Sequence, residues 1–196
     1  WHTLLAAVMP QASESLGEVE MAERLDGWAA SLDAVPGRNS FGLRGACLAE
    51  NAEPFLDLFL DVLRFPRLEA SSVDRERARL LDKLMARDDR PARRAWNLGM
   101  ESLFGKHPYG QPVEGTDETI RHVRAADLVK LYEEQYKMQA PTIVLVGNFD
   151  AARVLGRLLR AFPASTEAIN PTVQPASVTY QNPPANGPTV LELPRE

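Results

Sequence analysis

The three histidines of the chain, His2, His107 and His122, are the side chains best suited to bind a transition metal. A helical zinc site needs two histidines four residues apart, so that both rings project from one face, with a glutamate beside them. No two of these histidines have that spacing, so the sequence shows no histidine-based zinc site. We expect His2 to lie at a frayed end. His107 stands among turn-forming residues, where a structural hydrogen bond is favoured over catalysis.

Thiol, hydroxyl and carboxylate side chains form no catalytic pattern either. The single cysteine, Cys47, cannot form an intrachain disulfide, and in a predicted strand a packed thiol is more common than a nucleophile. The acidic pairs at 88–89 and 133–134 are typical of solvated faces. Three serines without an identifiable His/Asp partner are interpreted as turn and cap residues: Ser40, Ser71 and Ser72. Residue types and spacing alone therefore identify no active site.

The elements that must position these side chains are mostly helical. Apolar residues recur at helical spacing in six segments. These are residues 18–30, 53–64, 71–87, 91–104, 127–136 and 151–162. Two further segments indicate β-structure: a hairpin from Ser31 to Leu48 that turns at Pro36, and a short buried strand from Thr142 to Val146. Helices and strands mixed without regular βαβ alternation favour an α+β fold. Four aromatic residues are expected in the core: Trp28, Phe55, Phe59 and Trp96.

Composition narrows the class of protein. With 44% hydrophobic side chains among 196 residues, the chain can form one large core or a compact two-lobed one. The 22 basic and 27 acidic residues leave a net charge of −5, which argues against a nucleic-acid partner because phosphate neutralisation needs a basic excess. No apolar run reaches the roughly 20 residues of a membrane span, and no signal-peptide pattern opens the chain. The sequence predicts a soluble globular domain.

Both ends of the sequence suggest a piece of a larger protein. The chain begins at Trp1 and runs directly into apolar residues, and seven of its fifteen prolines fall between Pro163 and Pro194. We therefore expect a lobe over residues 1–162, shortened at its N-terminus, and a proline-rich linker over 163–196 that leads to a second lobe. Residues 189–193 alternate as the first strand of that next unit. An apolar patch left uncovered by the missing parts is expected to make the isolated chain self-associate.

The segment from His107 to Ile120 resembles the HPYG-x-P-x-x-GT-x-E-x-I motif of the pitrilysin/insulinase-type zinc metallopeptidases, which include the mitochondrial processing peptidases. Residues 126–136 and 143–150 resemble the helix and the strand-and-cap that follow in that family, and 65–91 resembles the region that precedes it. The retained family positions are Glu76, His107, Pro108, Tyr109, Gly110, Gly115 and Thr116. The resemblance covers residues 3 to 160. It implies an α+β metallopeptidase-like lobe with several helices packed on a mainly antiparallel sheet.

In that family an HxxEH helix and a distant glutamate hold zinc, and the motif glutamate activates water. Aligned on the resemblance, Thr3 and Ala7 stand in place of the two histidines, Ala6 in place of the motif glutamate, and Lys83, seven residues after Glu76, in place of the distant ligand. A lysine ammonium has no lone pair and repels Zn²⁺. The resemblance therefore implies a degenerate domain with no catalytic residues and no metal of its own.

The family is built from duplicated halves that enclose a chamber, and commonly one half carries zinc. The resemblance thus implies an inactive domain that contributes chamber wall and assembly to an active, zinc-bearing half, in the same polypeptide or in a partner subunit. A bacterial cytoplasm or periplasm is the expected compartment. An active zinc endopeptidase with a non-standard site and a structural core subunit without peptidase activity remain alternatives. The hairpin from Ser31 to Leu48 could bind peptide as an added strand, although an ordinary core hairpin is favoured.

Overall fold

The computed structural model of the chain describes residues 1–88, 90–137 and 141–163. Asp89 of one acidic pair, and the predicted linker and strand beyond residue 163, lie outside the described residues. The helices are α1 (His2–Val8), α2 (Glu18–Gly27), α3 (Ala52–Arg64), α4 (Ala70–Asp88), α5 (Pro91–Phe104), α6 (Asp117–Arg121), α7 (Ala125–Tyr132) and α8 (Ala151–Ala161). Shorter helical turns are η1 (Met9–Gln11), η2 (Ala49–Asn51), η3 (Pro108–Gly110) and the π-helical η4 (Glu133–Lys137).

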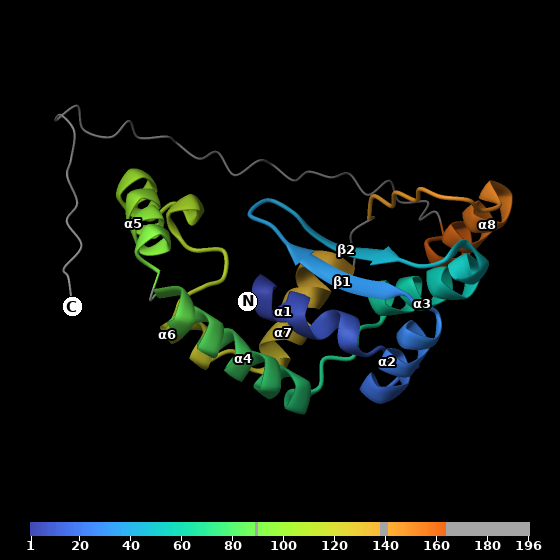
Figure 1. The fold of residues 1–196 in the computed structure, drawn as a ribbon, viewed down its shortest axis with the longest axis horizontal. Helices are drawn as coiled ribbons and strands as arrows, with labels where there is room; N and C mark the ends of the chain where they lie inside the picture. Colours follow the sequence, from blue (N-terminus) through green and yellow to red (C-terminus); the bar gives the residue numbers. More distant parts are fainter. Residues whose placement is uncertain (89, 138–140, 164–196) are drawn as a thin grey trace.

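The predicted hairpin is present as β1 (Ser31–Pro36) and β2 (Phe41–Ala46), an antiparallel pair in which Ser31 faces Ala46. Its turn closes where the amide of Gly37 donates to the carbonyl oxygen of Ser40 at 2.8 Å. A Cβ at position 37 would lie 2.9 Å from the Ser40 hydroxyl and 3.0 Å from its carbonyl oxygen, so glycine suits this tight turn. The hairpin lies across the middle of the molecule, with α1 beneath β1 (Figure 1).

The main core surrounds α1. Its side chains Leu4, Leu5 and Val8 are completely buried, because the helix packs against both β1 and α4. A helix that is apolar on nearly every side is stable only when it is enclosed in this way. Burying each such side chain contributes about 1.5–3 kcal/mol. Residues of other elements complete this core: Val62, Val73, Leu80, Leu84, Ile120, Val123 and Leu128. The arrangement is α+β, as the sequence predicted.

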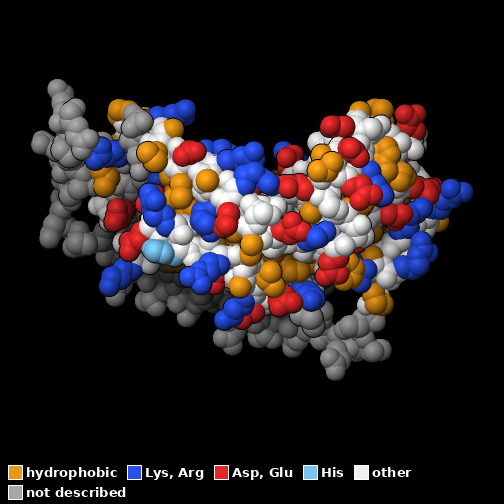
Figure 2. All heavy atoms as spheres, turned by 90° about the horizontal axis from the view of Figure 1, so that it is seen from below, with side chains coloured by type: hydrophobic (Ala, Val, Ile, Leu, Met, Phe, Trp, Pro, Cys, Tyr) orange, Lys and Arg blue, Asp and Glu red, His pale blue; other side chains and the backbone are white. Residues whose placement is uncertain are grey.

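Helix α4 begins at Ala70, one residue before the predicted capping serine, so Ser71 lies inside the helix and Ser72 is buried. On the face of the molecule shown in Figure 2, basic and acidic side chains are interspersed, and α4 contributes ion pairs such as Arg77–Asp74 at 2.8 Å. Exposed pairs of this kind stabilise by only about 0–1 kcal/mol each. Among the described residues, no helix combines the length and the apolar character that crossing a bilayer requires.

Of the aromatic residues predicted to be in the core, Phe55 is buried, and Trp28 and Phe59 are half-buried against the main core. The prediction for Trp96 was wrong, because its side chain is 61% exposed. Its helix, α5, has no buried residue and packs mainly against η3 and the end of α4, away from the core (Figure 1). Helical periodicity alone did not reveal that α5 packs away from the main core.

The prediction of a buried strand from Thr142 to Val146 was also wrong. Residues 142–146 have no strand assignment, and Val144 and Val146 are 79% and 94% exposed. Ile143 and Leu145 pack against a second, small cluster formed by α3 and α8. A strand is defined by hydrogen bonds to a neighbour, and no described strand lies beside this segment. Residues 142–146 therefore alternate between packed and exposed side chains, as in a strand, but they belong to no sheet among the described residues.

Candidate functional site around the first helix

The positions predicted to replace the zinc motif lie on α1, at the centre of the molecule. The hydroxyl of Thr3 donates to the carbonyl oxygen of Val113 at 2.8 Å. Ala6 is buried, with 7% of its surface exposed, and the carbonyl of Ala7 accepts from the Gln11 side-chain amide at 2.8 Å. Packing or a structural hydrogen bond therefore occupies each of these three positions.

Helix α4 packs against α1, as a pairing of Thr3 and Ala7 with Lys83 would require. Lys83 itself is exposed, while Leu80 and Leu84 on either side of it face the core. Helix packing brings the two elements together without showing which residue stands at each motif position. The assignment of Thr3, Ala6, Ala7 and Lys83 to those positions therefore stays a prediction.

Glu76, a retained family position, is a buried carboxylate on the same face of α4. It accepts from the side-chain amide of Gln11 at 2.9 Å and from Arg79 at 2.7 Å. Arg75 extends the network, donating to the Gln11 side-chain oxygen at 2.8 Å and pairing with Glu18. A buried carboxylate needs such partners, because leaving it unpaired costs several kcal/mol. In this chain Glu76 ties α4 to η1, and its neighbour Arg75 ties α4 to η1 and to the start of α2.

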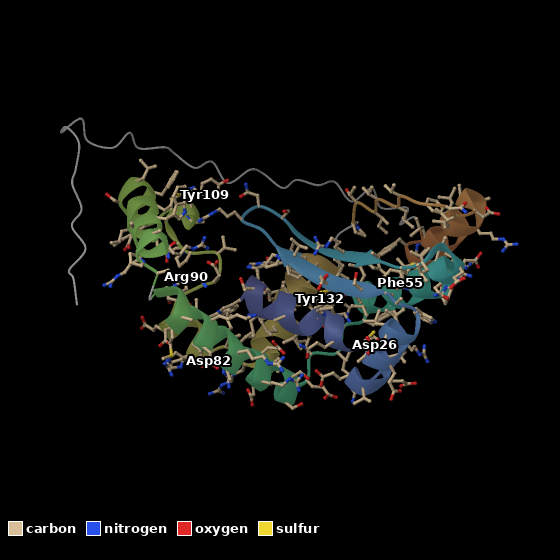
Figure 3. All side chains as sticks on the ribbon, viewed as in Figure 1. Asp26, Phe55, Asp82, Arg90, Tyr109 and Tyr132 are labelled. Atoms are coloured by element: carbon tan, nitrogen blue, oxygen red, sulfur yellow. The ribbon has the colours of Figure 1, made fainter. Side chains whose placement is uncertain are left out.

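The HPYG segment is a structural turn. His107 precedes η3, and its Nδ1 atom accepts from the backbone amide of Tyr109 at 3.1 Å, as the expected structural hydrogen bond. The Tyr109 ring stands edge-on to His107, with 5.0 Å between ring centroids, and lies between α5 and the tip of the hairpin (Figure 3). A Cβ on Gly110 would lie under 3.0 Å from the carbonyl oxygen of Gly105, so that only glycine fits there.

The hairpin tip is fastened to this turn by residues that the sequence identified only as part of a turn. The Arg38 guanidinium donates to the carbonyl oxygens of Tyr109 at 3.0 Å and Gln111 at 3.1 Å, and lies 3.4 Å from that of Pro108. The Asn39 amide donates to the Tyr109 hydroxyl at 2.7 Å. The guanidinium of Arg38 can bind these carbonyl oxygens only because the fold brings the turn after His107 next to the hairpin tip. The sequence around Arg38 does not predict that contact.

Gly115 and Thr116 start α6. Gly115 has φ +86°, in the region that glycine adopts without strain. The Thr116 hydroxyl accepts from the Thr119 amide, and the Thr119 hydroxyl accepts from the Thr116 amide at 3.0 Å, which forms a capping box. This cap sets the helix that buries Ile120 in the main core. Residues 107–116, which include six of the predicted family positions, thus shape a loop, and the same loop carries Val113, the partner of Thr3.

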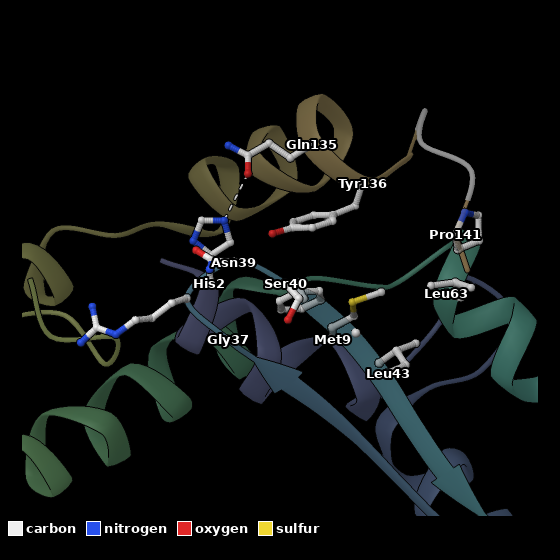
Figure 4. A pocket seen from close by; sticks show the side chains of 13 residues that line it. His2, Met9, Gly37, Asn39, Ser40, Leu43, Leu63, Gln135, Tyr136 and Pro141 are labelled. Carbon is white, nitrogen blue, oxygen red and sulfur yellow. Dashed lines mark hydrogen bonds between the residues drawn. The ribbon is translucent and has the colours of Figure 1, made fainter. Parts of the chain in front are cut away.

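A groove of about 640 Å³ opens between α1, the hairpin and η4 (Figure 4). The Nε2 atom of His2 lies 3.2 Å from the side-chain oxygen of Gln135, so this residue is anchored and the expectation of a frayed end was wrong. Tyr136 stacks on Phe41, with 4.7 Å between centroids. The groove is lined by His2, Met9, Gly37, Arg38, Asn39, Ser40, Phe41, Gly42, Leu43, Leu63, Gln135, Tyr136 and Pro141. Among the described residues, that lining has no carboxylate or thiol, and its hydrogen-bonding and aromatic side chains are suited to binding a ligand.

The donor set of this region does not fit zinc. Within the described residues, no three His, Cys, Asp or Glu side chains are grouped closely enough to hold a metal ion. A hydroxyl already bonded to a carbonyl, two methyl groups and an exposed ammonium offer none of the imidazole, thiolate or carboxylate ligands that zinc takes. Burial raises the pKa of the Cys47 thiol, which favours the unreactive protonated form.

No family model matches the chain. It is similar to an uncharacterised zinc protease of Mycobacterium leprae, with 26% identity over 132 residues, 67% of this chain and 30% of that protein. A zinc protease of Streptomyces coelicolor is 27% identical over 120 residues, 61% of this chain and 26% of that protein. Cytochrome b-c1 complex subunit 1 of Caenorhabditis elegans is 33% identical over 100 residues, 51% of this chain and 21% of that protein. The chain thus spans about a third or less of these relatives.

Solved structures share the fold. A peptidase M16 inactive domain from Pseudomonas fluorescens superposes with a TM-score of 0.61 at 22% identity, covering 66% of this chain and 32% of that one. A protease from Helicobacter pylori gives a TM-score of 0.70 at 17% identity, covering 82% of this chain and 39% of that one. The chain is thus similar in sequence to bacterial proteins named zinc proteases, and it shares the fold of solved M16 peptidase-like structures.

Proposed function

We propose that this chain is a catalytically inactive M16 domain that forms part of the wall of a peptidase chamber. The observation that carries the proposal is the state of α1. Its predicted motif positions hold a hydroxyl bonded to Val113, a buried methyl at Ala6 and a second methyl at Ala7. Such a helix contributes packing surface and no metal ligand.

The zinc that the family uses belongs, in this proposal, to an active half in the same polypeptide or in a partner subunit. The zinc proteases of Mycobacterium leprae and Streptomyces coelicolor are each more than three times as long as the matched region, which leaves room for such a half. Residues 1–162 would form the inactive lobe, and 163–196 the linker to a second lobe. Peptide held in the groove beside Phe41 and Tyr136 would be the domain's contribution to substrate binding.

A structural core subunit is the second candidate, because one of the matched relatives is subunit 1 of the cytochrome b-c1 complex. The bovine protein is 23% identical over 163 residues, 81% of this chain and 34% of that protein. The two candidate functions predict different effects on a zinc-bearing half. An inactive peptidase domain is expected to raise the cleavage rate of a zinc-bearing half, whereas a core subunit is expected to leave that rate unchanged.

The deciding experiment measures zinc per chain after dialysis and assays peptide cleavage on the same sample, alone and with a zinc-bearing half. We expect far less than one equivalent of zinc, no cleavage alone, and faster cleavage by the active half when this chain is present. Near one equivalent of zinc, with activity lost to a chelator and restored by zinc, would refute inactivity. His2 and His107 would then be the first residues to replace.

A further inference from the structure

Residues 91–115 form an arm that stands outside the main core. In the part of the chain that the structure describes, none of the buried or half-buried side chains that make up that core comes from these residues. Helix α5, which makes up more than half of the arm, has no buried residue. An isolated helix of this length is only marginally stable in water, so α5 depends on its contacts with neighbouring segments to stay folded.

The arm is held together by contacts at both ends of α5. At the end of the helix the ring of Phe104 stands edge-on to that of Tyr109, with 5.7 Å between centroids, and lies 6.0 Å from that of His107. In the first turn of the helix, Arg93 pairs with Glu114 at 2.6 Å. Both ends of α5 are therefore joined to the segment that follows it, and the arm is one structural unit.

The arm is fastened to the hairpin tip, residues 37–40, through one tyrosine. Arg38 donates to the carbonyl oxygens of the turn, including that of Tyr109 at 3.0 Å, and its guanidinium lies 5.7 Å from the centroid of the Tyr109 ring. The Asn39 amide donates to the Tyr109 hydroxyl at 2.7 Å. Tyr109 thus contacts Phe104 of α5 on one side and two tip residues on the other (Figure 3).

The hairpin tip depends on the arm in turn. All four residues 37–40 are exposed, and Phe41 is the first residue after them that packs against the main core. Within the tip, the amide of Gly37 donates to the carbonyl oxygen of Ser40. A two-stranded ribbon that extends beyond a core is marginally stable on its own. Two weakly held elements, the tip and the arm, therefore stabilise each other where they meet.

We propose that residues 37–40 and 91–115 form one cooperative unit, which unfolds and refolds as a whole while the main core stays folded. Units with few buried apolar contacts open most readily, and the contacts that couple the two parts of this one meet at Tyr109. This coupling does not depend on the proposed chamber role. Because the tip also lines the groove beside α1, opening of the unit changes the shape of that groove (Figure 4).

Hydrogen–deuterium exchange of the full 196-residue chain, read segment by segment, tests the coupling from both sides. Arg38→Ala removes the tip's donor and is expected to speed exchange about tenfold throughout α5, as well as in the turn after His107. Phe104→Ala removes the ring that joins α5 to that turn and is expected to speed exchange of the Gly37 amide in the tip. Exchange in α1 should stay unchanged in both variants, because the main core remains folded.

A neighbouring residue serves as the matched control for each variant. Arg44 lies on the same hairpin as Arg38, with 75% of its side chain exposed, and Arg44→Ala should not speed exchange in α5. Leu103 precedes Phe104 in α5 and is 52% exposed. Leu103→Ala should not speed exchange in the tip. Both controls delete a side chain of similar size that does not touch Tyr109 through any contact described above.

Three results would overturn the proposal. Faster exchange confined to residues 108–111 in Arg38→Ala would mean that the turn opens without α5. Faster exchange in α5 but not at Gly37 in Phe104→Ala would mean that the tip stays folded without the arm. An equal increase in α1 in either variant would mean that these residues open only together with the whole chain.

Discussion

Replacing Gly110 by alanine probes the close backbone packing of the HPYG turn. A Cβ at this position would lie under 3.0 Å from the carbonyl oxygen of Gly105, and 3.4 Å from two more backbone atoms of that residue. Ordinary contact begins at 3.4 Å, so the two backbone segments would have to move apart before alanine could fit. Gly105 has φ +53° and Gly110 is buried, which leaves little freedom on either side.

Forcing a methyl group into such a site costs about 1–3 kcal/mol. The matched control is Gly99→Ala, in the interior of α5, where an added Cβ meets nothing within 4 Å. Because glycine inside a helix is less stable than alanine by roughly 0.5–1 kcal/mol, this control is expected to stabilise. The same chemical change should therefore shift stability in opposite directions at two sites only eleven residues apart in the chain.

Urea denaturation gives the free energy of unfolding, and tryptic cleavage after Lys106 reports opening of the turn itself. Gly110→Ala is expected to lower the free energy of unfolding, or to speed cleavage after Lys106 if the turn opens locally. Gly99→Ala should do neither. A Gly110→Ala chain that matches the wild type in both measurements would refute the reasoning, because it would mean that the turn can relax without cost.

Two further predictions concern the clamp and the buried phenol. Arg38→Ala removes the donor shared by the carbonyls of residues 108–111 and should cost about 1–2 kcal/mol of local stability, seen as faster amide exchange in that turn. Arg44→Ala, whose guanidinium is exposed and 3.6 Å from its acidic partner, should leave exchange there unchanged. Burial raises the pKa of Tyr132 to about 12, and its hydroxyl donates to the carbonyl of Leu63 at 2.8 Å. The folded chain thus holds this proton more tightly than the unfolded chain, so the stabilisation is complete below pH 10 and is lost as the pH rises through about 12. Tyr132→Phe should remove that alkaline loss in urea titrations, and an unchanged pH profile would contradict the assignment.

Local sequence patterns predicted the features that depend on local chemistry. The hairpin followed from the turn at Pro36–Gly37, because proline fixes φ, and the end of α5 followed from Gly105, because glycine adopts a positive φ without strain. The exposure of Trp96 and of Val144 could not be predicted in this way. Periodicity shows that a segment has an apolar face, but which surface covers that face depends on residues distant in sequence.

In the candidate site, too, some residues could be identified from the sequence and others only from the structure. Motif similarity identified His107 and Gly110, but only the structure gives their roles as a hydrogen-bond acceptor and as the site of a close backbone approach. Arg38 and Asn39 were missed as functional side chains because their partners lie about seventy residues away. The one signal that could have found them is the presence of two long polar side chains at the tip of a hairpin.

On the proposed alignment, the absence of zinc ligands from α1 and the tight packing of this helix are physically linked. A zinc-binding helix must keep a polar face open to metal and water, which limits how much of it can be buried. On the proposed alignment, alanine at positions 6 and 7 lets α1 be enclosed, with Leu4, Leu5 and Val8 fully buried around it. A glutamate at position 6 would then bring a carboxylate into a site only 7% exposed, with the penalty of an unpaired buried charge. On this alignment the helix that would carry catalysis in an active domain is a core element, and reversing the three replacements on α1 would first have to reopen its packing.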